Sequence, residues 1–116
     1  MHNNCEWAGA ITNTLENSSS GITRYISEHF FAGEINIGGR PLSQMFQKGL
    51  SYKDMLGEAA LRIGKGEGTI GISAQGARQI ILDFGRAINE SGTTSQVRIW
   101  MNETGTSIRS LHPYIR

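Results

Sequence analysis

Cysteine is nearly absent from this chain of 116 residues, which carries a single thiol at Cys5. One cysteine excludes an internal disulfide framework and a zinc site built on paired cysteines. No apolar run approaches the roughly 18 residues that a membrane-spanning helix needs, and the first residues lack the cationic start and apolar stretch of a signal peptide. We therefore expect a small soluble domain with no membrane span.

Charge is also scarce, at 18% of the residues, and its two signs are unevenly distributed. Residues 1–34 hold one arginine against four glutamates, a net charge of −3, whereas residues 35–116 hold ten Lys or Arg against six Asp or Glu, a net charge of +4. A dedicated duplex-DNA binder normally carries a stronger positive excess. The mildly basic body is compatible with a polyanionic substrate contacted at a few phosphates, without requiring one.

Glycine is abundant instead. The 15 glycines are nearly twice the average share and indicate short elements joined by many loops. The chain length favours one domain that buries about 65% of its unfolded surface. A polar break from Asn17 to Gly21 suggests a boundary between two segments. Residues 1–17 would form a helical appendage, and residues 18–116 a single catalytic-type domain. We expect the appendage to be dispensable for activity.

Hydrophobic periodicity predicts helices first and a sheet last. Apolar residues at helical spacing predict four helices, at about residues 4–16, 22–33, 51–64 and 74–89. The third begins at Ser51-Tyr52-Lys53-Asp54, which has the form of a capping box. Strands are expected at residues 34–37 and 69–73, and alternating residues predict a hairpin with strands at 97–102 and 108–111. We therefore expect an α+β fold, with amino-terminal helices packed on a small antiparallel sheet that ends in a carboxy-terminal hairpin.

Two of the three histidines are candidates for acid–base chemistry, because imidazole titrates near neutrality. His29 lies on an amphipathic helical pattern, where a partly exposed structural residue is the alternative. His112 directly precedes Pro113, which should end the last strand. Strict alternation places Ser110 and His112 on one face and Arg109 on the other, so a site that uses Arg109 and His112 together requires the chain to turn at Pro113. A solvated structural role for His112 remains equally open.

Other kinds of site have little support. The sequence Lys65-Gly66-Glu67-Gly68-Thr69 lacks the Walker A order, so it is either a flexible connector or a contact from Lys65 to a nucleic-acid phosphate. No His, Cys and carboxylate residues have metal-ligand spacing, and no serine lies in a G-x-S-x-G elbow. RNA cleavage without a metal or cofactor suits the remaining residues, because the substrate supplies its own 2′-hydroxyl nucleophile. His29, His112 and Arg109 would then supply a base, an acid and a cation for the phosphorane.

The chain also resembles a family. Glu28-His29-Phe30-Phe31-Ala32-Gly33-Glu34 is similar to the stretch with a histidine, two apolar residues and a glycine in bacterial EndoU-like toxins, and Ile108-Arg109-Ser110-Leu111-His112-Pro113-Tyr114 is similar to their last strand. Leu15-Glu16-Asn17-Ser18 is similar to the Asn-rich motif before many such modules. These features resemble the barnase/EndoU/colicin/RelE-type ribonuclease toxins of contact-dependent growth inhibition and other polymorphic toxin systems. Where EndoU-type members carry a second histidine after a glycine pair, this chain has Arg40.

The resemblance implies a secreted or delivered effector that acts in the cytosol of a target cell. It implies cleavage of RNA, with transfer RNA as one candidate, and neutralisation by a cognate immunity protein. The chain would then be a module of a larger toxin protein.

The resulting hypothesis is a small ribonuclease toxin domain that uses neither metal nor cofactor. Its expected catalytic residues are His29, His112, Arg109, Ser110 and Tyr114, and its expected phosphate contacts are Arg40 and Lys65. Ser110 would position the scissile phosphate, and Tyr114 would stack on or hydrogen-bond a base. The alternative is a non-enzymatic binding module, such as an immunity or adaptor protein, because Trp100 beside Arg98 has the residue types that dominate protein interfaces.

Overall fold

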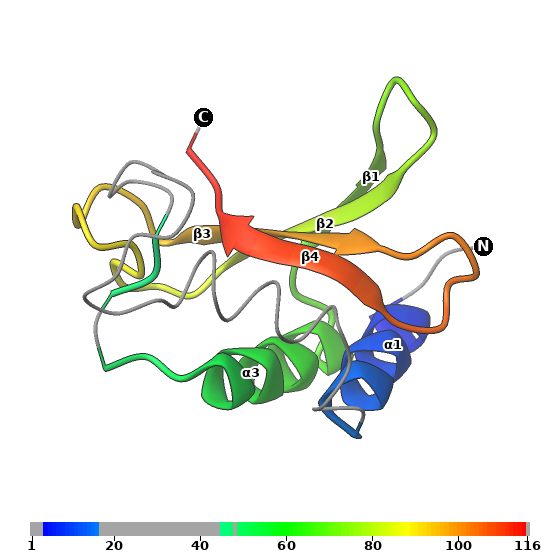
Figure 1. Ribbon diagram of the computed structural model, residues 1–116, viewed down its shortest axis with the longest axis horizontal. Helices are drawn as coiled ribbons and strands as arrows, with labels where there is room; N and C mark the ends of the chain where they lie inside the picture. Colours follow the sequence, from blue (N-terminus) through cyan, green and yellow to red (C-terminus); the bar gives the residue numbers. More distant parts are fainter. Residues whose placement is uncertain (1–3, 17–44, 48, 116) are drawn as a thin grey trace.

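The computed structural model describes residues 4–16, 45–47 and 49–115 (Figure 1). Within these ranges the chain forms two helices and four strands. They are α1 (Asn4–Glu16), α3 (Tyr52–Gly64), β1 (Thr69–Ile72), β2 (Arg78–Asp83), β3 (Gln96–Met101) and β4 (Ile108–Pro113). The expected α+β class and carboxy-terminal hairpin are confirmed. The helix expected at residues 22–33 and the strand expected at 34–37 lie outside the described residues.

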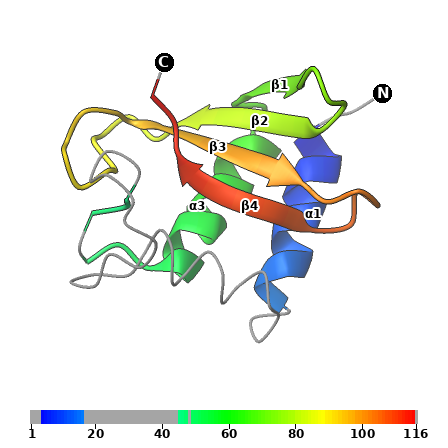
Figure 2. The same cartoon turned by 45° about the horizontal axis from the view of Figure 1, so that its top comes forward.

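The four strands form an antiparallel meander in the order β1-β2-β3-β4. Both helices lie against the same face of this sheet (Figures 1 and 2). Alternate strand residues on that face are buried, among them Ile80 and Leu82 of β2 and Val97 and Ile99 of β3. The opposite face of the sheet, which we call the outer face, is not covered by either described helix (Figure 2).

The helix α3 begins as the sequence predicts. Ser51 is its N-cap, and the Ser51 hydroxyl accepts a hydrogen bond of 2.9 Å from the backbone N–H of Asp54. The apolar stripe after this cap buries Met55, Leu56 and Ile63 against the sheet and α1. None of the helices in the described part of the chain is long and apolar enough to cross a membrane.

The helix expected at residues 74–89 is wrong. Residues 73–77 form the turn of a hairpin, and β2 occupies residues 78–83. Ile80 and Ile81 fit both a helical stripe and a strand, but β2 buries Ile80 on the core face and turns Ile81 to the outer face. Gly76 and Gly85 both have positive φ, which a right-handed helix does not allow, and they lie on either side of the strand. Tertiary pairing with β1 and β3 therefore overrides the helical periodicity.

The helix α1 belongs to the same hydrophobic core as α3 and the sheet. Trp7 and Ile11 are fully buried there, and the buried hydroxyl of Thr14 accepts a hydrogen bond of 2.9 Å from the backbone N–H of Ile108. Asn13 donates a second bond, of 2.7 Å, to the backbone carbonyl of Thr106. This packing joins residues 4–16 to the strands, although the sequence suggests a separable appendage.

Candidate functional site

The outer face carries most of the polar and aromatic side chains that the sequence singles out. Arg98 of β3 lies opposite His112 of β4, and Trp100 lies opposite Ser110. All four side chains are half-buried. The regular alternation of strands β3 and β4 brings these residues together, because their neighbours Ile99 and Leu111 point into the core.

Arg109 joins this group through an irregularity in the pairing of β3 and β4. Trp100 pairs with Ser110 but Met101 pairs with Ile108, so that Arg109 is the extra residue of a β-bulge. The guanidinium carbon of the exposed Arg109 lies 5.6 Å from the centre of the Trp100 ring on the outer face. The expectation that Arg109 and His112 point to different faces of the sheet is therefore wrong. No turn at Pro113 is needed to bring them to the same face.

The same bulge corrects the expected alternation in β4. Ile108 and Leu111 are both buried, although they are three residues apart. Strict alternation in steps of two would place them on opposite faces. The extra residue shifts the phase by one position and restores both side chains to the core.

His112 has its two ring nitrogens in different hydrogen bonds. The indole Nε1 of Trp100 can only donate, and it lies 3.2 Å from His112 Nε2, which therefore accepts. The other nitrogen, Nδ1, lies 3.0 Å from the backbone carbonyl oxygen of Pro113, to which it donates. These two contacts fit the imidazole tautomer that carries its proton on Nδ1 and a lone pair on Nε2.

Aromatic and arginine side chains alternate across the outer face. The guanidinium carbon of Arg98 lies 4.4 Å from the centre of the Tyr114 ring and 5.2 Å from that of Trp100, and Arg109 lies on the same Trp100 ring. We call Tyr114, Arg98, Trp100 and Arg109 the arginine–aromatic row. Each cation–π contact contributes about 0.5–1 kcal/mol at an exposed site. The row therefore orders two cations and two aromatic rings on one surface.

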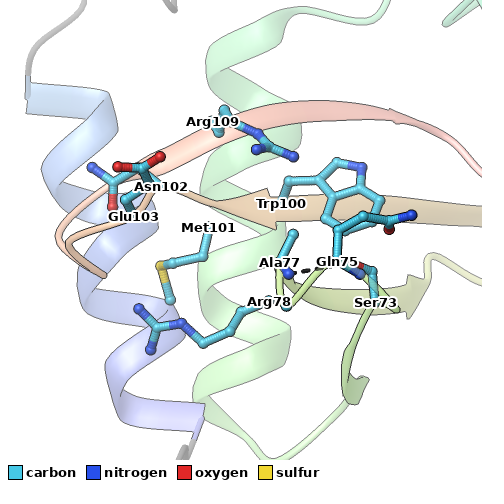
Figure 3. Close-up of a pocket in the computed structure, with 10 residues that line it drawn as sticks. Ser73, Gln75, Ala77, Arg78, Trp100, Met101, Asn102, Glu103 and Arg109 are labelled. Atoms are coloured by element: carbon cyan, nitrogen blue, oxygen red, sulfur yellow. Dashed lines mark hydrogen bonds between the residues drawn. The ribbon is translucent and has the colours of Figure 1, made fainter.

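A pocket of about 560 Å³ lies beside the row, between the turn that joins β1 to β2 and the turn that joins β3 to β4 (Figure 3). Trp100 and Arg109 form part of its wall. The other lining residues are Ser73, Gln75, Gly76, Ala77, Arg78, Met101, Asn102 and Glu103.

The polar groups of this pocket differ in their hydrogen-bonding capacity. The Asn102 amide is used within its own turn, where it bonds residues 106 and 107. Arg78 donates to Glu6 at 2.8 Å. The side chains of Gln75 and Glu103 form no hydrogen bond to any part of the chain that the structure describes. Two side chains at the pocket wall can therefore still bind a ligand.

Of the remaining predicted site residues, Lys65 is the one that lies within the described ranges. Lys65 is exposed at the end of α3, in the loop that leads to β1, and β1 and β4 are the two edges of the sheet. The structure therefore does not bring Lys65 together with Arg109 and His112. His29 and Arg40 lie outside the described residues. Sequence reasoning missed Gln75 and Glu103, because they come from two turns that only the folded sheet places at one pocket.

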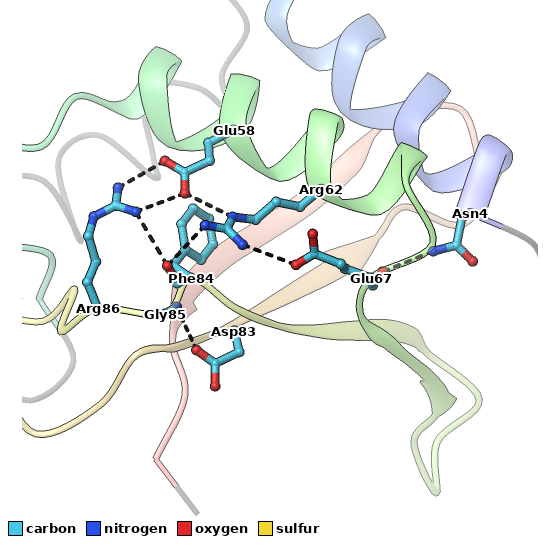
Figure 4. A network of polar contacts seen from close by, with 8 residues as sticks. All are labelled: Asn4, Glu58, Arg62, Glu67, Asp83, Phe84, Gly85 and Arg86. Atoms are coloured by element: carbon cyan, nitrogen blue, oxygen red, sulfur yellow. Dashed lines mark hydrogen bonds and ion pairs between the residues drawn. The ribbon is translucent and has the colours of Figure 1, made fainter.

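A second polar cluster joins α3 to the segment after β2 (Figure 4). Both Glu58 carboxylate oxygens accept hydrogen bonds of 2.9 Å from Arg86, and Arg62 bridges Glu58 and Glu67 at 3.0 and 3.1 Å. The hydrogen bonds from Arg86, with a smaller effect of Arg62, lower the pKa of Glu58 against the opposing effect of burial. Both guanidinium groups also lie 5.7 Å from the Phe84 ring. This cluster is internally satisfied and holds two elements together.

Within the described ranges, no three His, Cys, Asp or Glu side chains lie close enough to share a metal ion. Comparison with known proteins gives no direct guide to function: no protein-family model, curated protein or solved structure matches the chain.

Proposed function

We propose that the chain is a ribonuclease that needs no metal ion and cleaves RNA through attack of the 2′-hydroxyl on the adjacent phosphate. The observation that carries the proposal is the bulge in β4, which places Arg109 and His112 on one face beside the same Trp100 ring. These are the cation and the titratable group that this reaction requires. Ser110, the neighbour of Arg109 on that face, would position the scissile phosphate.

The hydrogen bonds of His112 favour a role as general base. Its Nε2 carries a lone pair, and the bond from Trp100 must open for that nitrogen to accept the 2′-hydroxyl proton. The 2′-oxygen then bonds to phosphorus, the bond from phosphorus to the 5′-oxygen breaks, and a general acid protonates the leaving oxygen. The planar guanidinium group of Arg109 stabilises the negative charge of the phosphorane. His29, the expected acid, lies outside the described residues, and its role stays a prediction.

The biological context follows from the resemblance to ribonuclease toxins. The proposal extends to a delivered effector that acts on RNA in the cytosol of a target cell, with transfer RNA as a candidate substrate and a cognate immunity protein as its partner. In this proposal Tyr114 offers a stacking surface for a base next to Arg98.

Cleavage of total RNA by the purified chain tests the proposal. We expect products with 2′,3′-cyclic phosphate ends and full activity in EDTA. His112→Ala should lower the rate about 10²- to 10⁴-fold, because it removes one proton-transfer partner. Lys53→Ala, which changes an exposed residue in the first turn of α3, is the matched control and should keep the wild-type rate. A folded wild-type chain that leaves RNA intact would overturn the proposal.

A non-enzymatic binding module is the second candidate. The observation in its favour is that His112 Nε2 is occupied by Trp100, within a row of the Trp, Tyr and Arg side chains that dominate protein interfaces. Absence of cleavage by the folded chain, together with tight binding of a protein partner that Trp100→Ala abolishes, would favour this candidate.

A further inference from the structure

We propose that the 560 Å³ pocket beside Trp100 is a subsite for one unpaired base of a single-stranded nucleic acid, and that it prefers bases with an exocyclic amino group. This inference rests on the proposed function for its biological meaning, because it names the substrate class of the same surface. The pocket volume lies within the roughly 300–1,000 Å³ of small-molecule sites.

The position of the pocket relative to the row supports a nucleotide as its ligand. Trp100 and Arg109 belong both to the pocket wall and to the arginine–aromatic row (Figure 3). A base stacked on Trp100 inside the pocket would therefore have its phosphate within reach of Arg109. Aromatic stacking combined with an arginine at the backbone is the general way in which proteins bind single strands.

The pocket geometry favours an unpaired base over a duplex. Its walls come in part from two turns, with Gln75 on one and Glu103 on the other, and Trp100 also lines it. A base can stack on Trp100 between these turns only after it leaves its own helix, where both of its faces are already stacked. Single-stranded RNA, loops and bulges are therefore the expected substrates.

Glu103 provides the basis for a preference among bases. An ionised carboxylate only accepts hydrogen bonds, and Glu103 has no protein donor among the described residues. Adenine and cytosine carry an exocyclic amino donor where uracil and thymine present a carbonyl oxygen, and guanine carries its amino donor at C2. Uracil and thymine offer only the ring N3–H, which lies between two carbonyl oxygens that repel the carboxylate. Gln75 has both donors and acceptors, so it adds affinity without this discrimination.

Binding of short DNA strands tests the subsite independently of cleavage, because DNA lacks the 2′-hydroxyl nucleophile. Tryptophan fluorescence is the readout: Trp7 is fully buried, so quenching by a stacked base reports on Trp100. We expect oligo-dC and oligo-dA to quench this fluorescence and to bind more tightly than oligo-dT, and a duplex to do neither. Trp100→Ala removes this reporter, so its affinity is measured by the fluorescence anisotropy of a labelled oligo-dC, and it should be about 5- to 150-fold weaker than that of the wild type.

The charge-neutral variant Glu103→Gln isolates the base preference. Its amide can donate to a thymine carbonyl, so the ratio of the dC and dT affinities should fall toward one. Glu16→Gln removes the same charge at the exposed end of α1 and should leave this ratio unchanged. A ratio unchanged in Glu103→Gln, equal binding of the duplex, or binding without quenching would overturn the subsite.

The ribonuclease proposal and the subsite proposal can be overturned independently of each other. Base-selective DNA binding by a chain that leaves RNA intact would keep the subsite and overturn the ribonuclease. RNA cleavage that is indifferent to Glu103→Gln and to base identity would keep the ribonuclease and overturn the subsite.

Discussion

At the residue scale, the position of Arg109 depends on one extra residue in β4. Without the bulge its side chain would point into the core, where a guanidinium group without partners is costly. With the bulge it lies on the Trp100 ring, which also donates to His112. One aromatic side chain therefore contacts both Arg109, the proposed cation, and His112, the proposed general base.

Arg109 variants test this assignment. We expect Arg109→Ala to lower the rate of RNA cleavage about 10²- to 10³-fold through loss of charge stabilisation in the transition state. Arg109→Lys should recover only part of the rate, because lysine lacks the planar two-pronged contact and stacks less well on Trp100. Kinetics on one oligonucleotide substrate measure both, after circular dichroism has shown that the variants fold. A lysine variant with the full wild-type rate would contradict a bidentate role.

Gly105 is a second position where a small change, the addition of a Cβ atom, should alter the stability of the fold. Its φ is +74°, and a Cβ built there would lie 2.5 Å from Nη2 of Arg78, which is paired with Glu6 of α1. Gly105→Ala should lower the free energy of unfolding by more than about 1 kcal/mol, since alanine is strained at positive φ and Arg78 must move. Gly57→Ala, within α3 and with no atom near its Cβ, should instead raise it by about 0.5–1 kcal/mol. Urea unfolding measures both, and equal effects would contradict the prediction.

At the scale of the elements, β2 decides whether residues 78–83 behave as a strand or as a helix. A helical stripe would bury Ile80 and Ile81 alike, whereas the strand buries only Ile80 completely. We expect Ile80→Ala to cost about 2–5 kcal/mol of unfolding free energy and Ile81→Ala to cost less than half as much. Chemical denaturation measures the difference. Equal losses would contradict the strand.

The cluster between α3 and the segment after β2 predicts a dependence of stability on pH. Because the folded state lowers the pKa of Glu58 below its ordinary value of 4.5, the ionised carboxylate stabilises the fold above that pH. This contribution is lost as the pH falls through the lowered pKa. Asp83, whose pKa is lowered chiefly by the backbone N–H of Gly85, adds a loss in the acid range below its ordinary 3.8.

Glu58→Gln separates the contribution of this cluster. The variant should be less stable than the wild type at neutral pH, where the ion pairs with Arg62 and Arg86 are intact. The difference should shrink as the pH falls below about 4.5, because the wild-type carboxyl then also becomes neutral. Urea unfolding at several pH values measures it. A difference that is constant with pH would contradict the assigned role.

At the scale of the whole molecule, α1 connects parts of the chain that are far apart in sequence. Besides Trp7 in the core, Glu6 binds Arg78 and Asn4 donates to the backbone carbonyl of Glu67 at 2.9 Å. The Thr14 hydroxyl accepts a hydrogen bond from the backbone N–H of Ile108, the first residue of β4. A helix with contacts to α3, β2 and β4 shares its stability with the entire fold.

Deletion of residues 1–17 tests this integration. We expect the shortened chain to lose cooperative unfolding and near-ultraviolet circular dichroism, because the core loses Trp7 and Ile11. As a milder probe, Trp7→Ala should cost about 3–5 kcal/mol of unfolding free energy. Exposed Thr12→Ala in the same helix is the control and should change it by less than about 0.5 kcal/mol. A folded, active deletion variant would restore the interpretation of this segment as a dispensable appendage.

Local signals in the sequence determined much of the fold. The Ser51 cap and its apolar stripe define α3, helical spacing defines α1, and alternation defines β3, the first strand of the carboxy-terminal hairpin. These signals succeed because they depend on contacts within one element or between two consecutive strands. The prediction of a helix at residues 74–89 was wrong because apolar side chains at 80, 81, 84 and 88 fit a helix as well as a strand. Only the pairing of β2 with its two neighbouring strands resolves this ambiguity.

The sequence also named His112, Arg109, Ser110 and Trp100 as candidates by residue type, but it could not place them relative to one another. Their arrangement depends on the register between Trp100 and Met101 of β3 and the facing residues of β4. A shift of one residue in register moves a side chain from one face of a sheet to the other. Tertiary packing fixes that register, because both Ile108 and Leu111 must reach the core beneath α1 and α3, and Arg109 is turned outward as a result.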